Sequence, residues 1–351
     1  MYYDNIQVIK RSGQLESFDI RKINQITEWM TDSVEDVSQG ELEAELAQLL
    51  HGIKKIKSVE LHELIIISAI KLITAKRPNY QYVASRGALF KLRKDVLGQF
   101  EPVHITKIIN DNIDRKYYDG DILNAYSFTE INELNEYIDH KRDFSFTYAG
   151  LKQVISKYLV RNRITSELYE TPQYMYMLIP MTLFKGEKDT SKRLKLIKGY
   201  YDAISTFKLN IPTPIMAGCR TTTKQYSSCV LIDIDDDLDS IAHSRVAITK
   251  YISQKAGIGL NLRFRALGDS IRNGEVEHTG IVPFIQTLEK TVKETVQNGI
   301  RGGCFPPVHE VEVVKTIKIN GKDYLPNDMV HVGTHYSRAI DIYNNHLKNS
   351  L

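Results

Sequence analysis

The hydrophobic pattern of this chain changes near Pro212, and that change limits the folds available to it. Before this position, apolar residues recur at three- and four-residue intervals, which is the spacing of amphipathic helices. After it, short apolar runs are separated by glycines and polar turns, with helical stretches at 238–254 and 282–296. Strands that alternate with helices are typical of an α/β sheet or barrel. The sequence therefore predicts a mostly helical part followed by an α/β part.

Composition and charge exclude several other classes. The chain has 351 residues, of which 42% are hydrophobic and 25% charged, as in ordinary globular proteins. Its 46 basic and 43 acidic residues leave a net charge of +3, which gives no reason to expect direct nucleic-acid binding or a membrane surface as partner. The longest apolar stretch, 64–75, is interrupted by Lys71 and is too short to span a bilayer.

The cysteines and the N-terminus indicate the compartment. Three cysteines, an odd number in a long chain, do not form a disulfide framework. The first residues lack a positively charged start followed by an apolar core, which a secretory signal would have. We therefore expect a cytoplasmic protein, in the host cytoplasm if its source is viral.

Turn residues and periodicity divide the chain into four predicted segments. Residues 1–98 contain a hairpin, 7–10 with 15–18, and then four helices, the second opening on a capping box at Ser38 and Glu41. The other segments are an all-helical layer at 99–211, an α/β part at 212–303, and a tail at 304–351 with a strand pair (311–319 and 322–325) and a helix over 336–347.

Cys229 stands at the start of a predicted strand, after two serines. A thiol there is either a small core residue or a redox group. The residue type alone favours the core, because free cysteine is among the most buried residues. The hydroxyls of Ser227 and Ser228 and the rigid Pro212-Thr213-Pro214 segment favour a polar site instead.

Charged residues suggest three further sites, each with an ordinary alternative. Four arginines stand among glycines, a pattern that suits phosphate binding but equally fits solvated arginines in ordinary turns. It matches neither a Walker loop nor a Rossmann fingerprint. An acidic run at 233–239 fits a helix N-terminus better than a divalent-ion site, although one carboxylate could accept a ribose hydroxyl. The basic residues Lys10, Arg11, Lys22 and Lys94, with His62, either surround one phosphate or are ordinary surface residues.

Taken together, these strings resemble a known family. They are Pro212-Thr-Pro-Ile-Met-Ala-Gly, Ser227-Ser-Cys-Val-Leu-Ile, Ser253-Gln-Lys-Ala-Gly-Ile-Gly-Leu-Asn261, Arg265-Ala-Leu-Gly, His278-Thr-Gly and Gly299-Ile-Arg-Gly-Gly303. In the same order, they resemble the large catalytic subunit of class I ribonucleoside-diphosphate reductase. Val8-Ile-Lys-Arg-Ser-Gly and the 80–100 stretch resemble the ATP cone of that family. The resemblance implies an ATP cone, a helical domain and the first half of a ten-stranded α/β barrel.

The resemblance also implies roles for single residues. Cys229 corresponds to one of two thiols that reduce the ribose 2′-carbon and end as a disulfide. The implied substrate residues are Thr213, Ser228, Ala256, Gly257 and Arg301, and the implied specificity-effector residues are Asp236, Arg265, Arg272 and Gln297. The implied activity site for ATP or dATP comprises Lys10, Glu16, Lys22, Ser58, His62 and Lys94. Ser58 stands where the family often has threonine, which leaves inhibition by dATP open.

Implied ligands and partners follow from the same family. ATP and deoxynucleotide effectors would bind with Mg²⁺, and no metal site is expected in this chain. A small subunit would carry a di-iron tyrosyl radical, thioredoxin or glutaredoxin would supply electrons, and the reconstituted large subunits would form a dimer.

The resemblance is expected to end at Gly303, with Cys304 opening a tail that has no family counterpart. The radical cysteine, the second redox cysteine, their glutamate and the radical-transfer tyrosines are not identifiable, and Cys219 is expected to be structural. We therefore expect a naturally split subunit, like those of some large phages, with a second polypeptide supplying the C-terminal half. Two alternatives are a noncatalytic, nucleotide-binding regulatory remnant and an intein-like segment that begins at Cys304.

Overall fold

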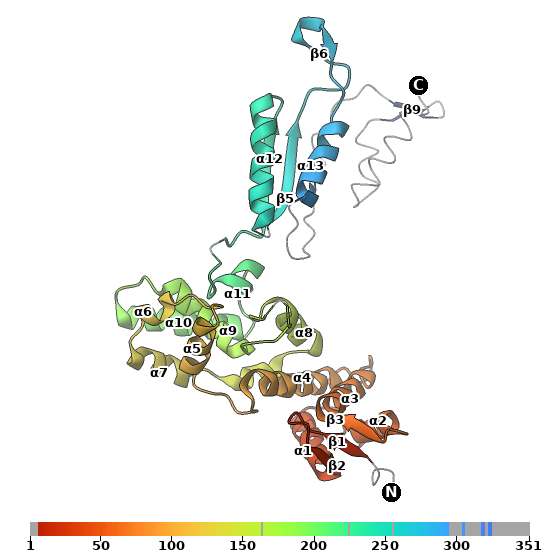
Figure 1. Ribbon diagram of the computed structural model, residues 1–351, viewed down its shortest axis with the longest axis vertical. Helices are drawn as coiled ribbons and strands as arrows, with labels where there is room; N and C mark the ends of the chain where they lie inside the picture. The colour runs from red at the N-terminus through yellow and green to blue at the C-terminus, as the bar shows by residue number, and fades with distance from the viewer. Residues whose placement is uncertain are drawn as a thin grey trace. The chain divides into compact units, whose positions relative to one another are not determined.

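The computed structural model describes residues 6–162, 164–223, 225–254 and 256–294, and three short strands at 304–305, 317–319 and 322–324. The chain separates into two compact units, Met1–Tyr226 and Ser227–Leu351 (Figure 1). Among the described residues, no helix is both long and apolar enough to cross a membrane.

The first unit begins with a small sheet. Strand β1 (Gln7–Ile9) pairs antiparallel with β2 (Leu15–Ser17), which confirms the predicted hairpin. Strand β3 (Lys55–Lys57) lies on the other side of β1 and runs parallel to it. This third strand was not predicted, because three residues with one apolar side chain, Ile56, give no periodic signal.

Four helices follow, as predicted: α1 (Ile20–Thr31), α2 (Gln39–Leu50), α3 (Ser58–Lys71) and α4 (Tyr80–Leu97). The capping box expected at α2 is only half formed. The Ser38 hydroxyl accepts from the Glu41 amide at 3.4 Å, but the Glu41 carboxylate instead accepts from Tyr80 and pairs with Arg77. Those two longer side chains come from a distant part of the chain and satisfy the carboxylate in place of the local amide.

Residues 105–218 form an all-helical layer. Its helices are α5 (Ile105–Asp114), α6 (Asp121–Ala125), α7 (Phe128–Tyr137), the 3₁₀ helix η1 (His140–Ser145), α8 (Tyr148–Lys157), α9 (Pro172–Phe184), α10 (Thr190–Ser205) and α11 (Thr213–Gly218). The sequence predicted this layer over 99–211 and the α/β part from 212, whereas α11 and the residues up to Tyr226 belong to the first unit. Helix α9 is central, since every residue from Pro172 to Met181 is buried. Leu89 and Leu92 of α4 belong to the same hydrophobic core, so α4 packs against this layer as well as against the N-terminal module.

The second unit is α/β, as predicted. Strands β4 (Cys229–Asp235), β5 (Gly257–Arg263) and β8 (Cys304–Phe305) form a parallel sheet in the order β4-β5-β8. Helices α12 (Leu238–Ser253) and α13 (Val282–Glu294) contribute Ile248 and Leu288 to its core, with Ile234 and Leu260 from the strands.

Two antiparallel strand pairs complete this unit. Strands β6 (Ser270–Ile271) and β7 (Val276–Glu277) flank the 3₁₀ turn η2 (Arg272–Gly274). Strands β9 (Ile317–Ile319) and β10 (Lys322–Tyr324) pair as the sequence predicted for these positions. The helix predicted over 336–347 lies outside the described residues.

Candidate functional site

The starts of β4 and β5 bring together four of the predicted site residues. Cys229 lies opposite Gly257 in the parallel register, and Ser228 and Ala256 directly precede these two positions. The Gly257 amide donates to the Ser228 carbonyl at 2.7 Å. A Cβ atom on Gly257 would lie 3.3 Å from that carbonyl oxygen, so glycine permits the two strand starts to approach this closely.

The two cysteines of known environment differ. Within this chain Cys229 is exposed, which favours the redox interpretation, whereas Cys219 is buried, as a structural cysteine would be. Burial raises the pKa of the Cys219 thiol to about 11, which keeps it protonated and unreactive near neutral pH. Of Cys219 and Cys229, it is therefore Cys229 that is accessible for exchange chemistry.

Thr213 lies in the first unit and is the exposed first residue of α11. A buried ion pair between Arg220 and Glu170 holds the segment that contains it. Arg220 and Glu170 are both fully buried, and the guanidinium Nε donates to the carboxylate at 2.8 Å. Arg220 Nη1 also donates to the Met216 carbonyl at 2.5 Å, at the end of α11. The Glu170 carboxylate further accepts from the Val160 amide at 2.7 Å and from the Tyr118 hydroxyl. Sequence reasoning missed this pair because no local pattern marks an arginine as buried.

Two of the four predicted specificity residues, Asp236 and Arg265, lie just after the ends of β4 and β5. Asp236 accepts from the Arg265 amide at 3.3 Å and forms an ion pair with the same guanidinium. Arg272 is exposed in η2 with φ of +51°, and no hydrogen bond or ion pair within the described ranges joins it to Asp236 or Arg265. The structure thus brings two of these residues together, and not the third.

The acidic run at 233–239 leads into the N-terminus of α12, as one of its two interpretations predicted. Asp237 is the N-cap of α12 and accepts from the Ser240 amide at 2.8 Å. Asp233 accepts from the Asn261 side chain at 2.9 Å and lies 3.7 Å from the Arg263 guanidinium. In the part of the chain that the structure describes, no cluster of three or more potential metal ligands occurs.

A pocket of about 140 Å³ in the N-terminal module gathers five of the six predicted activity-site residues, namely Lys10, Glu16, Lys22, Ser58 and His62. We call it the N-terminal pocket. Its other lining residues are mostly apolar, and Ser58 is the first residue of α3, where backbone amides favour an anion. The Glu16 carboxylate binds both ammonium groups, at 2.6 Å from that of Lys10, and these bonds lower the pKa of Glu16.

His62 lines the N-terminal pocket, whereas Lys94 lies outside its lining. His62 is buried, its Nε2 donates to the Gly87 carbonyl at 2.8 Å, and burial lowers its pKa, so its ring is neutral at pH 7. Lys94 does not line the pocket. Its ammonium lies 5.8 Å from the centre of the Phe90 ring, which stacks on His62.

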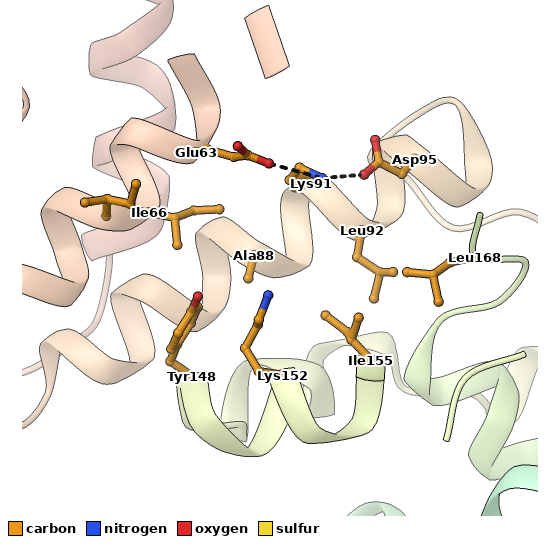
Figure 2. Close-up of a pocket in the computed structure, with 11 residues that line it drawn as sticks. Glu63, Ile66, Ala88, Lys91, Leu92, Asp95, Tyr148, Lys152, Ile155 and Leu168 are labelled. Carbon is orange, nitrogen blue, oxygen red and sulfur yellow. Dashed lines mark hydrogen bonds and ion pairs between the residues drawn. The ribbon is translucent and has the colours of Figure 1, made fainter. Parts of the chain in front are cut away.

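A second hollow, which we call the α4–α8 groove, has a volume of about 270 Å³ and contains none of the predicted site residues. Figure 2 shows Ala88 and Leu92 of α4 facing Tyr148, Lys152 and Ile155 of α8 across it. The remaining predicted residues, Gln297 and Arg301, lie outside the described residues.

Comparison with known proteins identifies the class to which this arrangement belongs. The ATP cone domain matches residues 6–95, the all-alpha domain of ribonucleotide reductase matches 144–224, and the barrel domain of ribonucleotide reductase matches 227–319. These domains define a ribonucleotide reductase.

Individual relatives narrow the identification. The chain is 41% identical over 344 residues to the ribonucleoside-diphosphate reductase subunit alpha of Buchnera aphidicola from Schizaphis graminum, covering 97% of this chain and 44% of that protein. It is 43% identical over 322 residues to subunit alpha of reductase 1 of Escherichia coli K12, covering 90% and 42%. It is 40% identical over 332 residues to the subunit of Enterobacteria phage T4, covering 93% and 43%. The chain belongs to the family of class I ribonucleotide reductase large subunits and spans the N-terminal portion, less than half, of these relatives.

These matches correct one expectation. The barrel match continues past Gly303 to residue 319, and Cys304 begins β8, which pairs with β5 in the barrel sheet. The expectation that the family resemblance ends at Gly303 is therefore wrong. The continuation across Cys304 also argues against an intein-like segment starting there.

Proposed function

We propose that this chain is the N-terminal part of a reductase subunit that converts ribonucleoside diphosphates to deoxyribonucleoside diphosphates. The observation that carries this proposal is the exposed Cys229 thiol, held beside Ser228 and Gly257 at the start of the barrel sheet. The names of the relatives, all ribonucleoside-diphosphate reductase alpha subunits, support the same reaction.

In this reaction, Cys229 acts as one of two reducing thiols. The ribose C2′–O bond breaks and the oxygen leaves as water, while two thiols lose two electrons and two protons and become a disulfide. An exposed sulfur at a strand start can then be reset by thiol–disulfide exchange with thioredoxin or glutaredoxin. A separate small subunit with a di-iron tyrosyl radical starts the reaction.

The barrel needs residues beyond those of this portion, and we propose that a second polypeptide supplies them. The matched relatives are more than twice as long as the part to which this chain aligns, and the described barrel sheet has three strands in this chain. Strand β4 carries Leu231 with 87% of its surface exposed, a large apolar side chain that further barrel residues would cover. This proposal makes the isolated chain inactive and the reconstituted large subunits dimeric.

The chain also binds the effectors. In the N-terminal pocket, Lys10 and Lys22 bind the phosphates of ATP or dATP with Mg²⁺, and the apolar lining takes the base. Lys94, whose ammonium lies over the Phe90 ring, serves the same site. Asp236, Arg265 and Arg272 bind the specificity effector, for which the Asp236–Arg265 pair must open.

Complementation tests the catalytic proposal. The chain is purified alone and then mixed with a polypeptide carrying the C-terminal half of the subunit, the small subunit and a thioredoxin system, and deoxynucleoside diphosphate is measured. We expect no product from the isolated chain, product from the mixture, and none from a mixture with Cys229→Ser. Cys219→Ala is the matched control, because that thiol is buried, and should retain activity.

The outcomes separate the alternatives. Product from the isolated chain would refute the split, and full activity of Cys229→Ser would refute the role of the thiol. ATP binding without turnover in the complete mixture would instead favour the regulatory remnant, which the N-terminal pocket also supports.

Equilibrium dialysis with ATP tests the pocket. Loss of two charge-assisted bonds in Lys10→Ala/Lys22→Ala should weaken binding about tenfold or more. Lys107→Ala, an exposed lysine on α5, is the control and should bind ATP normally.

A further inference from the structure

A chain of buried polar side chains crosses the core of the first unit, separate from the Arg220–Glu170 pair. It begins at Arg93 on α4, whose guanidinium donates to the Asp143 carboxylate of η1 at 3.2 Å and to the His140 carbonyl at 2.9 Å. Asp143 accepts from the Gln173 amide of α9 at 2.8 Å, and the Gln173 oxygen accepts from the Tyr201 hydroxyl of α10 at 2.7 Å. All four of these side chains are almost completely buried. The chain therefore connects α4 to the two main helices of the helical layer.

Stability alone does not explain these groups. A buried ion pair often contributes no more to stability than apolar residues of similar volume, whereas it fixes one relative geometry of the elements that it joins. Here the geometry is fixed further by rings, because the Arg93 guanidinium lies 5.1 Å from the centre of Phe100 and 5.9 Å from that of Phe144. The pair thus determines where α4 sits against η1 and α9.

Helix α4 also contacts the N-terminal pocket. Its Gly87 carbonyl accepts from His62, and its Phe90 ring stacks on the same imidazole at 5.2 Å between ring centres. Gly87, Phe90 and Arg93 are successive positions three residues apart on one helix. A ligand that displaces His62 would therefore alter the contacts of His62 with α4, the helix that bears Arg93.

Helix α4 contacts α8 as well as the N-terminal module. Beside that contact, the α4–α8 groove of about 270 Å³ is lined by Ala88 and Leu92 of α4 and by residues of α8 (Figure 2). In that groove, the Lys91 ammonium bridges Asp95 at 2.9 Å and Glu63 at 3.8 Å, so its polar contacts stay on α3 and α4. Within the described residues, Arg93 hydrogen-bonds α4 to η1 of the helical layer.

We propose that Arg93 and Asp143 are positioning residues that couple nucleotide binding in the N-terminal pocket to helices α9 and α10. The inference rests on the proposed function of that pocket and adds the route by which its occupancy reaches the helical layer. An effector can bias the layer only if the connection differs between the free and bound states, and the Arg93–Asp143 pair is the contact that would change.

The test uses the full chain and hydrogen exchange. Amide exchange is measured by mass spectrometry with and without Mg-ATP, in the unmodified chain and in Arg93→Met/Asp143→Leu. The double replacement removes both charges together, so it avoids an unpaired buried charge and should fold. Arg193→Met/Glu130→Gln is the matched control, because that pair joins α10 to α7 without touching α4.

We expect ATP to slow exchange in α9 and α10 of the unmodified chain and the control about fivefold or more. In Arg93→Met/Asp143→Leu, ATP should bind with unchanged affinity while this distal slowing is lost. Retained slowing in the double variant, or ATP binding without slowing in the unmodified chain, would overturn the coupling alone. Absence of ATP binding to the unmodified chain would overturn the proposed function of the pocket and the coupling with it.

Discussion

Replacement of Arg220 by methionine should strongly destabilise the first unit. The change leaves the Glu170 carboxylate fully buried without its cation, and it removes the bond from Nη1 to the Met216 carbonyl and the 3.0 Å bond from Nη2 to the Tyr158 carbonyl. Breaking a buried ion pair by removing one partner costs about 3–5 kcal/mol. For a unit of this size, that loss corresponds to a fall in Tm of about 6–20 °C.

The single tryptophan of the chain, Trp29, lies in the first unit, so its fluorescence follows the unfolding of that unit during heating or in urea. The double variant Arg220→Met/Glu170→Leu leaves no unpaired charge and should be much closer to the unmodified chain. Arg21→Met removes an exposed pair with Asp19 and is the control, expected to leave the stability nearly unchanged. If Arg220→Met unfolded within about 1 kcal/mol of the unmodified chain, or the double variant were the less stable of the two, the reasoning on burial and charge would be refuted.

Two further predictions concern the strand starts and the buried carboxylate. Gly257→Ala should displace the Ser228 carbonyl, which a Cβ would approach to 3.3 Å, and so lower product formation in the complemented reductase. Gly199→Ala is the control, because a Cβ there meets open space and should leave product formation unchanged. Equal activities of the two variants would show that the close approach is unimportant. Burial raises the pKa of Asp143 to about 6 from an ordinary 3.8. The native state thus binds the Asp143 proton more tightly, so the free energy of unfolding should fall by about 2 kcal/mol as pH rises from 4 to 6. Urea unfolding of Asp143→Asn across this range should lack that contribution, and an identical pH profile would contradict the assignment.

Local sequence signals predicted the main elements of the fold. The four N-terminal helices and the hairpin follow from periodicity and turn residues, and they occur where expected. Strand β3 was missed because its pairing with β1 depends on tertiary contact, as does the diversion of Glu41 from its own helix cap to Tyr80 and Arg77. In both cases a distant partner outweighs the local preference.

The candidate site was predictable to a different extent in each region. Resemblance placed Lys10, Glu16, Lys22, Ser58 and His62 in one group, and they line one pocket. Residue type alone favoured the core for Cys229, but its strand start leaves it exposed. The Arg220–Glu170 and Arg93–Asp143 pairs could not be predicted, because each joins positions about 50 residues apart and burial of a charge has no local signature.

The aromatic cluster beside the N-terminal pocket contains Trp29, whose intrinsic fluorescence depends on its surroundings. The Trp29 indole packs edge-on against Phe100 at 5.0 Å and tilted against Phe90 at 6.1 Å, and Phe90 stacks on His62. Rearrangement of the imidazole when the pocket fills would alter the surroundings of the indole and hence its emission wavelength and quantum yield. If the pocket binds nucleotide as proposed, the emission of Trp29 would report its occupancy in real time, without a label, in the unaltered protein.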